Sequence, residues 1–394
     1  MSIRTVTVAA AVGGLLLSLP AAPAQARDDH RRGTAPAVVV ADHLPVGRRP
    51  RVAYVDGTAL VRPDGSRVRF RRPIEHPLRV AGGHLVSVAR SQARRPGRGD
   101  IYFVSDSGRR RLFLRGSDRP SARRWSTEQA VASENGRLVA FTTFSSAQSV
   151  LVARVPDGRV VRTRSAADPL PGKVLAIQGR RALLWQPPTY YDGRGTGRLL
   201  WWAVDSGRIT RSATTPPARF MPGYAGMNWH LALANLRTRQ VVVPAGRRQL
   251  VRPIPGARRR SWYTDRDEAV LTWSPDGRFV TTAPPPQEVY LEMSATSDIR
   301  VRRASTGRVV ARYRGDLFSD ALGSRAPTWE PGSDSFLTSA WTGVDREDPD
   351  HAFRTGHRYV RCTVSSTSCT RILPSLRTRG RDAQESPFAG VRPR

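Results

Sequence analysis

The stretch LTWSPDGRFVTT, residues 271–282, decides the fold of this chain. Two short apolar runs flank a turn made of Ser274, Pro275, Asp276 and Gly277. In such a turn the Asp side chain bonds the backbone ahead of it, and glycine takes the positive φ that closes a hairpin without a Cβ clash. We therefore predict a tight β-hairpin here, with Asp276 and Gly277 shaping the backbone.

The same pattern of apolar run, turn ending in Gly plus a polar residue, and second apolar run recurs along the chain. One series of hairpins is rich in Arg and is spaced by about 45 residues. It comprises ALVRPDGSRVRF (59–70), IYFVSDSGRRRLFL (101–114), VLVARVPDGRVVRTR (150–164), LLWWAVDSGRITRSA (199–213), IRVRRASTGRVVARY (299–313) and two degenerate copies, LALANLRTRQVVV (231–243) and the hairpin at 358–373. A series of this length and spacing indicates a repeat architecture.

A second series of hairpins lies between the first, and it is more apolar and richer in Trp. Its members are 78–91, 130–144, 173–186, 269–283 and 326–341. An inner apolar hairpin followed by an outer Arg-rich hairpin makes a four-stranded sheet, and such sheets repeated radially are the blades of a β-propeller. We therefore predict an all-β fold with a single β-propeller of seven four-stranded blades, with six or eight as alternatives. The predicted blades are 51–70 (partial), 76–114, 130–164, 172–213, 222–245, 262–313 and 326–373.

Residues 273–278, Trp-Ser-Pro-Asp-Gly-Arg, resemble the signature of the TolB-type β-propeller repeat, in which this turn joins the two inner strands of a blade. The match weakens elsewhere: residues 329–332 keep the Trp and the Pro, and residues 133–137 keep the Ser and the Gly-Arg. The chain is also similar to uncharacterised secreted propellers of actinobacteria. The resemblance implies a propeller over roughly residues 50–375 and permits many functions.

The chain divides into four predicted segments. Residues 1–26 have the order of a secretory signal peptide, cleaved after Ala26, with a retained anchor as the alternative. Residues 27–50 are predicted to be a flexible N-terminal segment, 51–374 the propeller, and 375–394 a disordered basic tail. The first blade lacks an inner strand, which Ala37 to Ala41 or the C-terminal tail could supply. After cleavage we expect no transmembrane anchor and a secreted, extracytoplasmic protein.

The chain contains two cysteines, Cys362 and Cys369. In an exported protein such a pair is expected to form a disulfide. The flanking segments are β-like and the middle is rich in Ser and Thr, so the disulfide would clamp a hairpin across its two strands.

The formal net charge is +32, and of 64 basic residues only Lys173 is lysine. A preference for arginine indicates a GC-rich genome. The charge favours acidic partners such as an acidic envelope protein, wall polymers or anionic headgroups. Compositional drift that decorates solvated strand faces is the alternative, and it stays open because the arginines are spread along the chain. We do not expect specific nucleic-acid binding.

The connections between second and third strands are long in four blades, at residues 91–100, 187–198, 284–298 and 342–357. Long loops on a rigid scaffold are where binding sites tend to lie, so we predict a ligand site on the face that these loops share. Tyr190 and Tyr191 could form a stacking platform, or lie in a mobile loop, and Tyr290 lies in the third long loop. The other ligand candidates come from the fourth loop and are Asp345, Asp350, His351 and His357.

The fourth loop holds the densest acidic cluster of the chain: Asp345, Glu347, Asp348 and Asp350. Oxygen ligands at this spacing could hold Ca²⁺, although they fit no EF-hand loop. A carboxylate and His351 could instead share general acid/base work. The third interpretation is a solvated loop whose carboxylates neutralise nearby arginines.

The sequence carries no G-x-S-x-G, no H-E-x-x-H and no phosphate loop. We therefore predict a non-catalytic binding protein that recognises a protein or an anionic envelope polymer through its long-loop face, with no cofactor required. The alternative is a propeller hydrolase or lyase that uses the 342–357 loop, with Asp350 and His351 as its first candidates.

Overall fold

The computed structural model describes residues 35–88, 100–116, 125, 127, 130–142, 149–164, 173–186, 196–217, 233–266, 268–284, 297–318, 326–332, 334–342, 356–372 and 388. These residues belong to one compact unit, Thr34–Arg394. The predicted signal peptide lies outside them. The predicted limits of the propeller and of its tails stay predictions.

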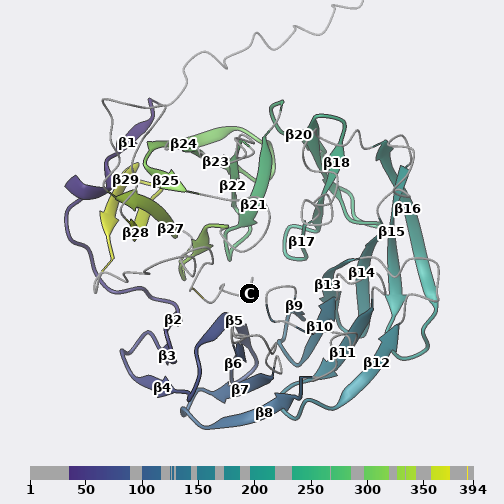
Figure 1. Ribbon diagram of the computed structural model, residues 1–394. Coiled ribbons are helices and arrows are strands. Elements are labelled where there is room, and N and C mark those ends of the chain that lie inside the picture. Colours follow the sequence, from purple (N-terminus) through teal and green to yellow (C-terminus); the bar gives the residue numbers. More distant parts are fainter. Residues whose placement is uncertain are drawn as a thin grey trace, which may run out of the picture. The chain divides into compact units, whose positions relative to one another are not determined.

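Seven antiparallel sheets are arranged around an axis, which makes the fold a seven-bladed β-propeller (Figure 1). The predicted fold class is confirmed. Blade I is β2 (Tyr54–Asp56), β3 (Ala59–Val61) and β4 (Arg67–Arg69); blade II is β5 (Ile74–Val80), β6 (Gly83–Val88), β7 (Ile101–Ser105) and β8 (Arg110–Leu114); blade III is β9 (Ala130–Ala132), β10 (Leu138–Thr142), β11 (Val150–Arg154) and β12 (Val160–Arg164); blade IV is β13 (Lys173–Gln178), β14 (Arg181–Gln186), β15 (Thr196–Ala203) and β16 (Ile209–Pro217).

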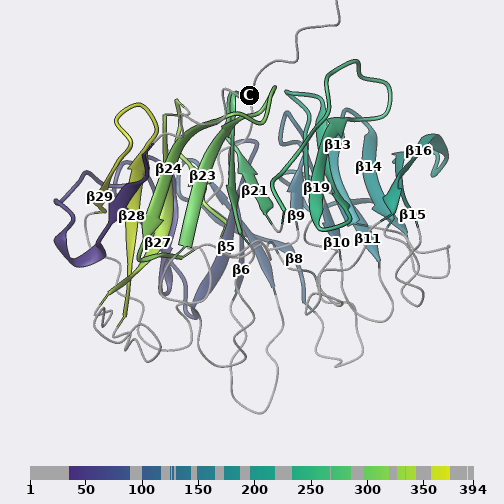
Figure 2. The same ribbon diagram turned by 90° about the horizontal axis from the view of Figure 1, so that it is seen from above.

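The remaining three blades complete the ring. Blade V is β17 (Leu233–Asn235), β18 (Gln240–Ala245), β19 (Arg248–Pro253) and β20 (Trp262–Tyr263); blade VI is β21 (Ala269–Trp273), β22 (Phe279–Ala283), β23 (Ser297–Arg303) and β24 (Val309–Gly315); blade VII is β25 (Leu317–Phe318) and β26 (Thr328–Trp329), which both pair with β27 (Ser335–Thr342), then β28 (Gly356–Thr363) and β29 (Ser368–Arg371). In Figure 2, which turns the ring by 90°, β23, β24, β27 and β28 run from one end of the ring toward the other. A 3-10 turn, η2 (Ala41–His43), precedes blade I.

The turn of the deciding stretch joins β21 to β22 as predicted. The Ser274 hydroxyl donates to Asp276 Oδ1 at 2.7 Å and accepts the Phe279 N–H at 3.0 Å. Blade III repeats this network with other residues, because Ser133 donates to Asn135 Oδ1 at 2.9 Å and accepts the Leu138 N–H at 3.0 Å. The weakened copy of the motif therefore keeps the same hydrogen bonds, with an amide in place of the carboxylate.

The turn glycines also contact the preceding blade. Gly158, in the β11–β12 turn, has φ 71°, and a Cβ there would lie 2.1 Å from the carbonyl oxygen of Phe113 in blade II. In blade VI, a Cβ on Gly307 would lie 2.6 Å from the ring of Trp262 in blade V. Close blade packing is thus a second reason why these turns use glycine.

The predicted limits of blade V are wrong. Residues 231–243, interpreted above as a degenerate outer hairpin, form the inner pair β17 and β18, and the outer pair is β19 and β20. The predicted start of blade VI at residue 262 is wrong for the same reason, because Trp262 pairs with Val251 of blade V. The segment of the outer hairpin carries Pro253 and Pro255. Because proline has no N–H to donate to a neighbouring strand, its presence argues against a strand in the sequence pattern.

Segments near both chain ends pair with strands of the ring. Blade I has three strands, and Phe388 forms an antiparallel bridge with Tyr54 of its first strand. This supports the C-terminal segment as the source of the missing inner strand, and the alternative source, Ala37 to Ala41, is wrong. Instead, β1 (Ala37–Val39) pairs in parallel with the outer strand β24 of blade VI. β1 and β24 lie side by side in Figure 1.

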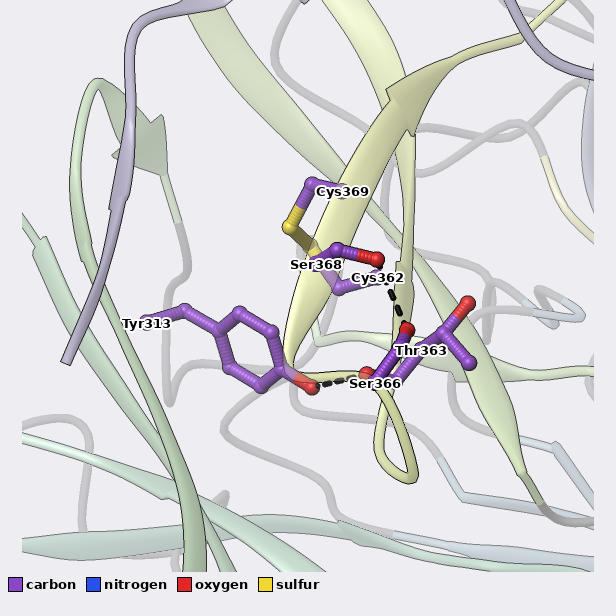
Figure 3. Close-up of a disulfide and its surroundings, with 6 residues drawn as sticks. All are labelled: Tyr313, Cys362, Thr363, Ser366, Ser368 and Cys369. Atoms are coloured by element: carbon purple, nitrogen blue, oxygen red, sulfur yellow. Dashed lines mark hydrogen bonds between the residues drawn. A yellow bond between two sulfur atoms is a disulfide. The ribbon is translucent and has the colours of Figure 1, made fainter. Parts of the chain in front are cut away.

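The predicted disulfide is present. Cys362 in β28 and Cys369 in β29 face each other across the hairpin and are joined (Figure 3). Figure 3 also shows the Tyr313 hydroxyl from blade VI, which donates to the carbonyl oxygen of Thr363 at 2.7 Å beside the same turn.

Candidate functional site

Most of the predicted site residues lie outside the described residues. This holds for Tyr190, Tyr191, Tyr290, Asp345, Glu347, Asp348, Asp350 and His351. The backbone of His357 is described, and it pairs with Trp341 between β28 and β27. The Ca²⁺ site and the catalytic alternative in the 342–357 loop therefore stay predictions.

The strand order supports the prediction that the four long connections share one face of the ring. The four long connections join β6 to β7, β14 to β15, β22 to β23 and β27 to β28, which are the second and third strands of their blades. Because successive strands of a blade are antiparallel, these connections start from the same end of the ring.

Blade V departs from this pattern. Its second and third strands are joined by Gly246 and Arg247 alone, whereas residues 254–261 join its third and fourth strands. The long connection of blade V therefore starts from the end of the ring opposite to the predicted binding face. The outer strand that follows it, β20, has two residues, compared with nine in β16 of the neighbouring blade IV.

A groove of about 580 Å³ lies where the short β20 leaves blade V uncovered beside β16. Pairing stops at Val251 and Trp262, and Pro253 has no N–H to offer to a longer outer strand. We call this cavity the blade IV/V groove. It is lined by Ser212, Ala213, Leu250, Arg252, Pro253, Ile254, Pro255, Gly256, Ala257, Ser261 and Tyr263.

The floor of the groove is held against blade IV. Ile254 is buried in a cluster that contains Trp185 and Trp201. The Trp201 indole N–H donates to the carbonyl oxygen of Pro255 at 3.3 Å, and the Ala257 N–H donates to the carbonyl oxygen of Ile254 at 2.9 Å. Residues 254–257 are therefore anchored to blade IV, and the arginines that follow Ala257 are attached to this anchored segment.

The walls of the groove offer one aromatic ring and several polar groups. Tyr263 is 53% exposed. Arg252 Nη1 donates to the carbonyl oxygen of Thr214 at 3.0 Å, which ties the guanidinium to blade IV. The exposed hydroxyls of Ser212 and Ser261 have no hydrogen-bond partner among the described residues. These groups can donate to or accept from a polar ligand.

Three successive arginines, Arg258, Arg259 and Arg260, stand in the sequence between Ala257 and Ser261, which both line the groove. We call them the arginine run. All three are exposed, and none makes a hydrogen bond or ion pair with the part of the chain that the structure describes. Their charge is therefore available to an anionic ligand.

Other arginines are engaged inside the ring. At the three interfaces between blades I and IV, an arginine of one blade donates a hydrogen bond to a backbone carbonyl of the next blade. That carbonyl lies two residues before the glycine in the turn between the third and fourth strands. The pairs are Arg62 with Asp106, Arg111 with Pro156 and Arg162 with Asp205. Some of the arginines therefore join neighbouring blades. This structural role is a third explanation of the high number of arginines, beside compositional drift and an acidic partner.

Arg302 is also paired within the protein, in this case with carboxylates. Its side chain is 7% exposed and contacts Glu268, which is 2% exposed, with Nη2 to Oε2 at 2.7 Å. Glu268 Oε1 accepts the Thr282 hydroxyl at 2.5 Å, and Arg302 also binds Asp265 at 2.7 Å. Each charge in this cluster is paired, and the cluster ties the connection between blades V and VI to β23 of blade VI.

The single lysine lies on an innermost strand. Lys173 begins β13, opposite Trp185, at the end of the ring from which the long connections start. Burial lowers the pKa of its ammonium group to about 8.

The described residues contain no group of three or more His, Cys, Asp or Glu side chains that could hold a metal ion. They also contain no helix that is long and apolar enough to cross a membrane.

Sequence analysis missed the blade IV/V groove, although IPGARRRSWY, residues 254–263, carries a signal. Three arginines follow a Pro and a Gly and precede two aromatic residues. That combination distinguishes this hairpin from the Gly-Arg turns of the other blades. The signal was not used because residues 254–261 lay between two predicted blades, one ending at residue 245 and the next beginning at residue 262.

No known protein-family profile matches the chain, and no curated protein matches it. Solved structures that resemble it include a chain of the mitotic checkpoint complex, with 13% identity and a TM-score of 0.45 over 76% of this chain and 80% of that one. TolB from Acinetobacter baumannii has 12% identity and a TM-score of 0.42 over 87% and 65% of the two chains. The propeller domain of the Trilobed protease from Pyrococcus furiosus has 10% identity and a TM-score of 0.43 over 82% and 83%. The fold itself rests on the seven sheets described above.

Proposed function

We propose that this protein is an exported, non-catalytic, TolB-like β-propeller that binds an anionic polymer of the cell envelope. The observation that carries the proposal is the arginine run, in which three exposed guanidinium groups lack partners among the described residues. It stands beside a groove, and the whole chain carries a net charge of +32. A protein partner, which the sequence left open, is less favoured because the groove offers charged and hydroxyl groups around a single exposed aromatic ring.

Electrostatics explains how such a surface would work. A field of one sign raises the local concentration of a polyanion and speeds its association. When arginines contact the polyanion, counterions are released from it, so the affinity falls as the salt concentration rises. The logarithm of the binding constant falls with the logarithm of the salt concentration, with a slope of about 0.7 per contacted charge for a flexible single strand. Three contacts from the arginine run would contribute a slope of about 2.

Export is part of the proposal. The predicted signal peptide over residues 1–26 supports it, and the Cys362–Cys369 disulfide is compatible with an oxidising compartment. In the wall or the medium, anionic polymers are accessible to the mature propeller.

The test compares the purified protein with two variants that lose the same charge. One carries Arg258→Ser, Arg259→Ser and Arg260→Ser; the control carries Arg109→Ser, Arg208→Ser and Arg308→Ser in the outer turns of blades II, IV and VI. Binding to polyphosphate and to polygalacturonate is measured between 50 and 300 mM salt. We expect the first variant to lose most of the affinity and about 2 units of the salt slope for polyphosphate.

The control is expected to lose much less, because its arginines are dispersed around the ring. Equal losses in the two variants would mean that only total charge matters. Absence of binding by the unaltered protein at 50 mM salt would refute the proposed function itself.

A further inference from the structure

We propose that the blade IV/V groove is a subsite for one sugar ring of an acidic polysaccharide, with Tyr263 as its stacking surface and Arg252 as its carboxylate contact. This inference rests on the proposed function and names the chemical class of the polymer. It follows from four features of the groove.

The first feature is the aromatic ring. Tyr263 is the only aromatic residue among the exposed large hydrophobic side chains of the described residues. It follows the arginine run by three residues and faces the groove from the outer edge of blade V. An exposed tyrosine gives a ligand a flat apolar face with a polar hydroxyl at its end. A sugar ring has the matching character, with an apolar face of C–H bonds and hydroxyls at its rim.

The second feature is the set of hydroxyls. Ser212 comes from β16 of blade IV and Ser261 from the connection in blade V, so they line the groove from both sides. Each hydroxyl can donate one hydrogen bond and accept two. Because neither has a partner among the described residues, both can exchange hydrogen bonds with sugar hydroxyls.

The third feature is a held guanidinium. Arg252 Nη1 donates to the carbonyl oxygen of Thr214 at 3.0 Å, which ties the group to the groove wall. Its other N–H groups make no hydrogen bond with the described residues. A guanidinium held in this way can donate to a carboxylate without losing much additional side-chain entropy.

The fourth feature distinguishes a polysaccharide from a single-stranded nucleic acid. Sites for single strands stack successive bases on successive aromatic side chains. The blade IV/V groove presents one aromatic ring, with hydroxyls and a guanidinium around it. This arrangement suits one ring at a time of a uronic-acid chain, while the arginine run contacts the carboxylates that follow.

The test uses polygalacturonate, polyphosphate and an oligothymidylate as probes. The variants are Tyr263→Ala, the conservative Tyr263→Phe, and the triple arginine variant described above. We expect Tyr263→Ala to weaken polygalacturonate binding by about tenfold, as loss of one stacking contact does. Polyphosphate binding should change by less than about twofold, and Tyr263→Phe should stay near the original protein. Because Tyr263 is exposed, the thermal unfolding of both variants should be unchanged.

The outcomes separate the two proposals. If Tyr263→Ala weakens the two polymers equally, or neither of them, the sugar subsite is wrong while the arginine run still accounts for polyanion binding. If the oligothymidylate is the probe that Tyr263→Ala weakens most, the ring stacks on bases and the subsite is wrong as well. If no probe binds even at 50 mM salt, the proposed function fails and the subsite fails with it.

Discussion

Arg361 holds Glu330 through both carboxylate oxygens, with Nε 2.6 Å from Oε2 and Nη2 2.8 Å from Oε1. Glu330 is fully buried beside β26. Arg361 also donates to the carbonyl oxygens of Arg48 and Arg49, and the Arg51 N–H donates to Glu330 Oε1 at 2.7 Å. The pair therefore joins blade VII to the segment that leads into blade I.

Replacing Glu330 by Gln keeps the volume and removes the charge. The guanidinium of Arg361 then stays in a largely buried position without its counterion, so the free energy of unfolding should fall by about 3 kcal/mol. Urea denaturation at pH 7 measures the change. The control is Asp56→Asn, which removes the exposed partner of Arg67 at 2.7 Å and should cost less than about 1 kcal/mol. Similar small losses in both variants would show that the buried pair does not contribute to ring closure.

The same pair predicts an acid-sensitive stability. Burial alone would raise the pKa of Glu330, but hydrogen bonds from Arg361, the Arg51 N–H and Ser335 outweigh it and hold the pKa below the ordinary value of 4.5. A carboxylate with a lowered folded pKa contributes stability that is fully present above 4.5 and is lost as the pH falls through the folded pKa. Stability measured from pH 6 downward should therefore fall more steeply in the original protein than in Glu330→Gln. Parallel curves would contradict the assignment.

Lys173 predicts a second pH dependence of stability, on the alkaline side. Burial lowers its pKa from 10.5 to about 8, so between these values the unfolded chain binds more protons than the folded chain. Stability contributed by this group should rise with pH across that window. Lys173→Met should be more stable than the original protein at pH 7, and the difference should shrink toward pH 10. The comparison is made by denaturant unfolding at both pH values, and a difference that does not change with pH would exclude the shift.

Gly158 predicts a stability cost that depends on blade packing. Alanine there would combine a φ of 71° with a Cβ placed 2.1 Å from the carbonyl oxygen of Phe113. We expect Gly158→Ala to lower the free energy of unfolding by about 3 kcal/mol. Gly179→Ala is the matched control, because its φ is 55° with nothing near the added Cβ, and it should lose about 1 kcal/mol. Equal losses would assign the whole effect to the turn conformation.

The hairpins could be predicted because their causes are local. Ser274, Asp276 and Gly277 form their turn through contacts within six residues, and Ser133 with Asn135 does the same in blade III. The outer hairpin of blade V could not be recognised, because Pro253 interrupts its pattern and only pairing with β18 identifies β19 as its third strand.

The candidate site was harder to predict than the fold. Loop length pointed to one end of the ring, and that argument needs only the order of the strands. The blade IV/V groove depends on Ser212 and Tyr263, which are far apart in the sequence and line one cavity because β16 is long and β20 is short. A difference in length between two neighbouring blades leaves no local pattern.

The sequence by itself determined the all-β repeat, the turn chemistry of residues 271–282 and the disulfide partners, because each depends on residues close together along the chain. Only the tertiary structure decided where the chain ends pair: Phe388 bridges Tyr54 of blade I, and β1 pairs with β24 of blade VI. It also decided which arginines join blades and which stay free. Those outcomes depend on where each blade places its neighbour's carbonyl oxygens and outer strands, and that is a property of the assembled ring.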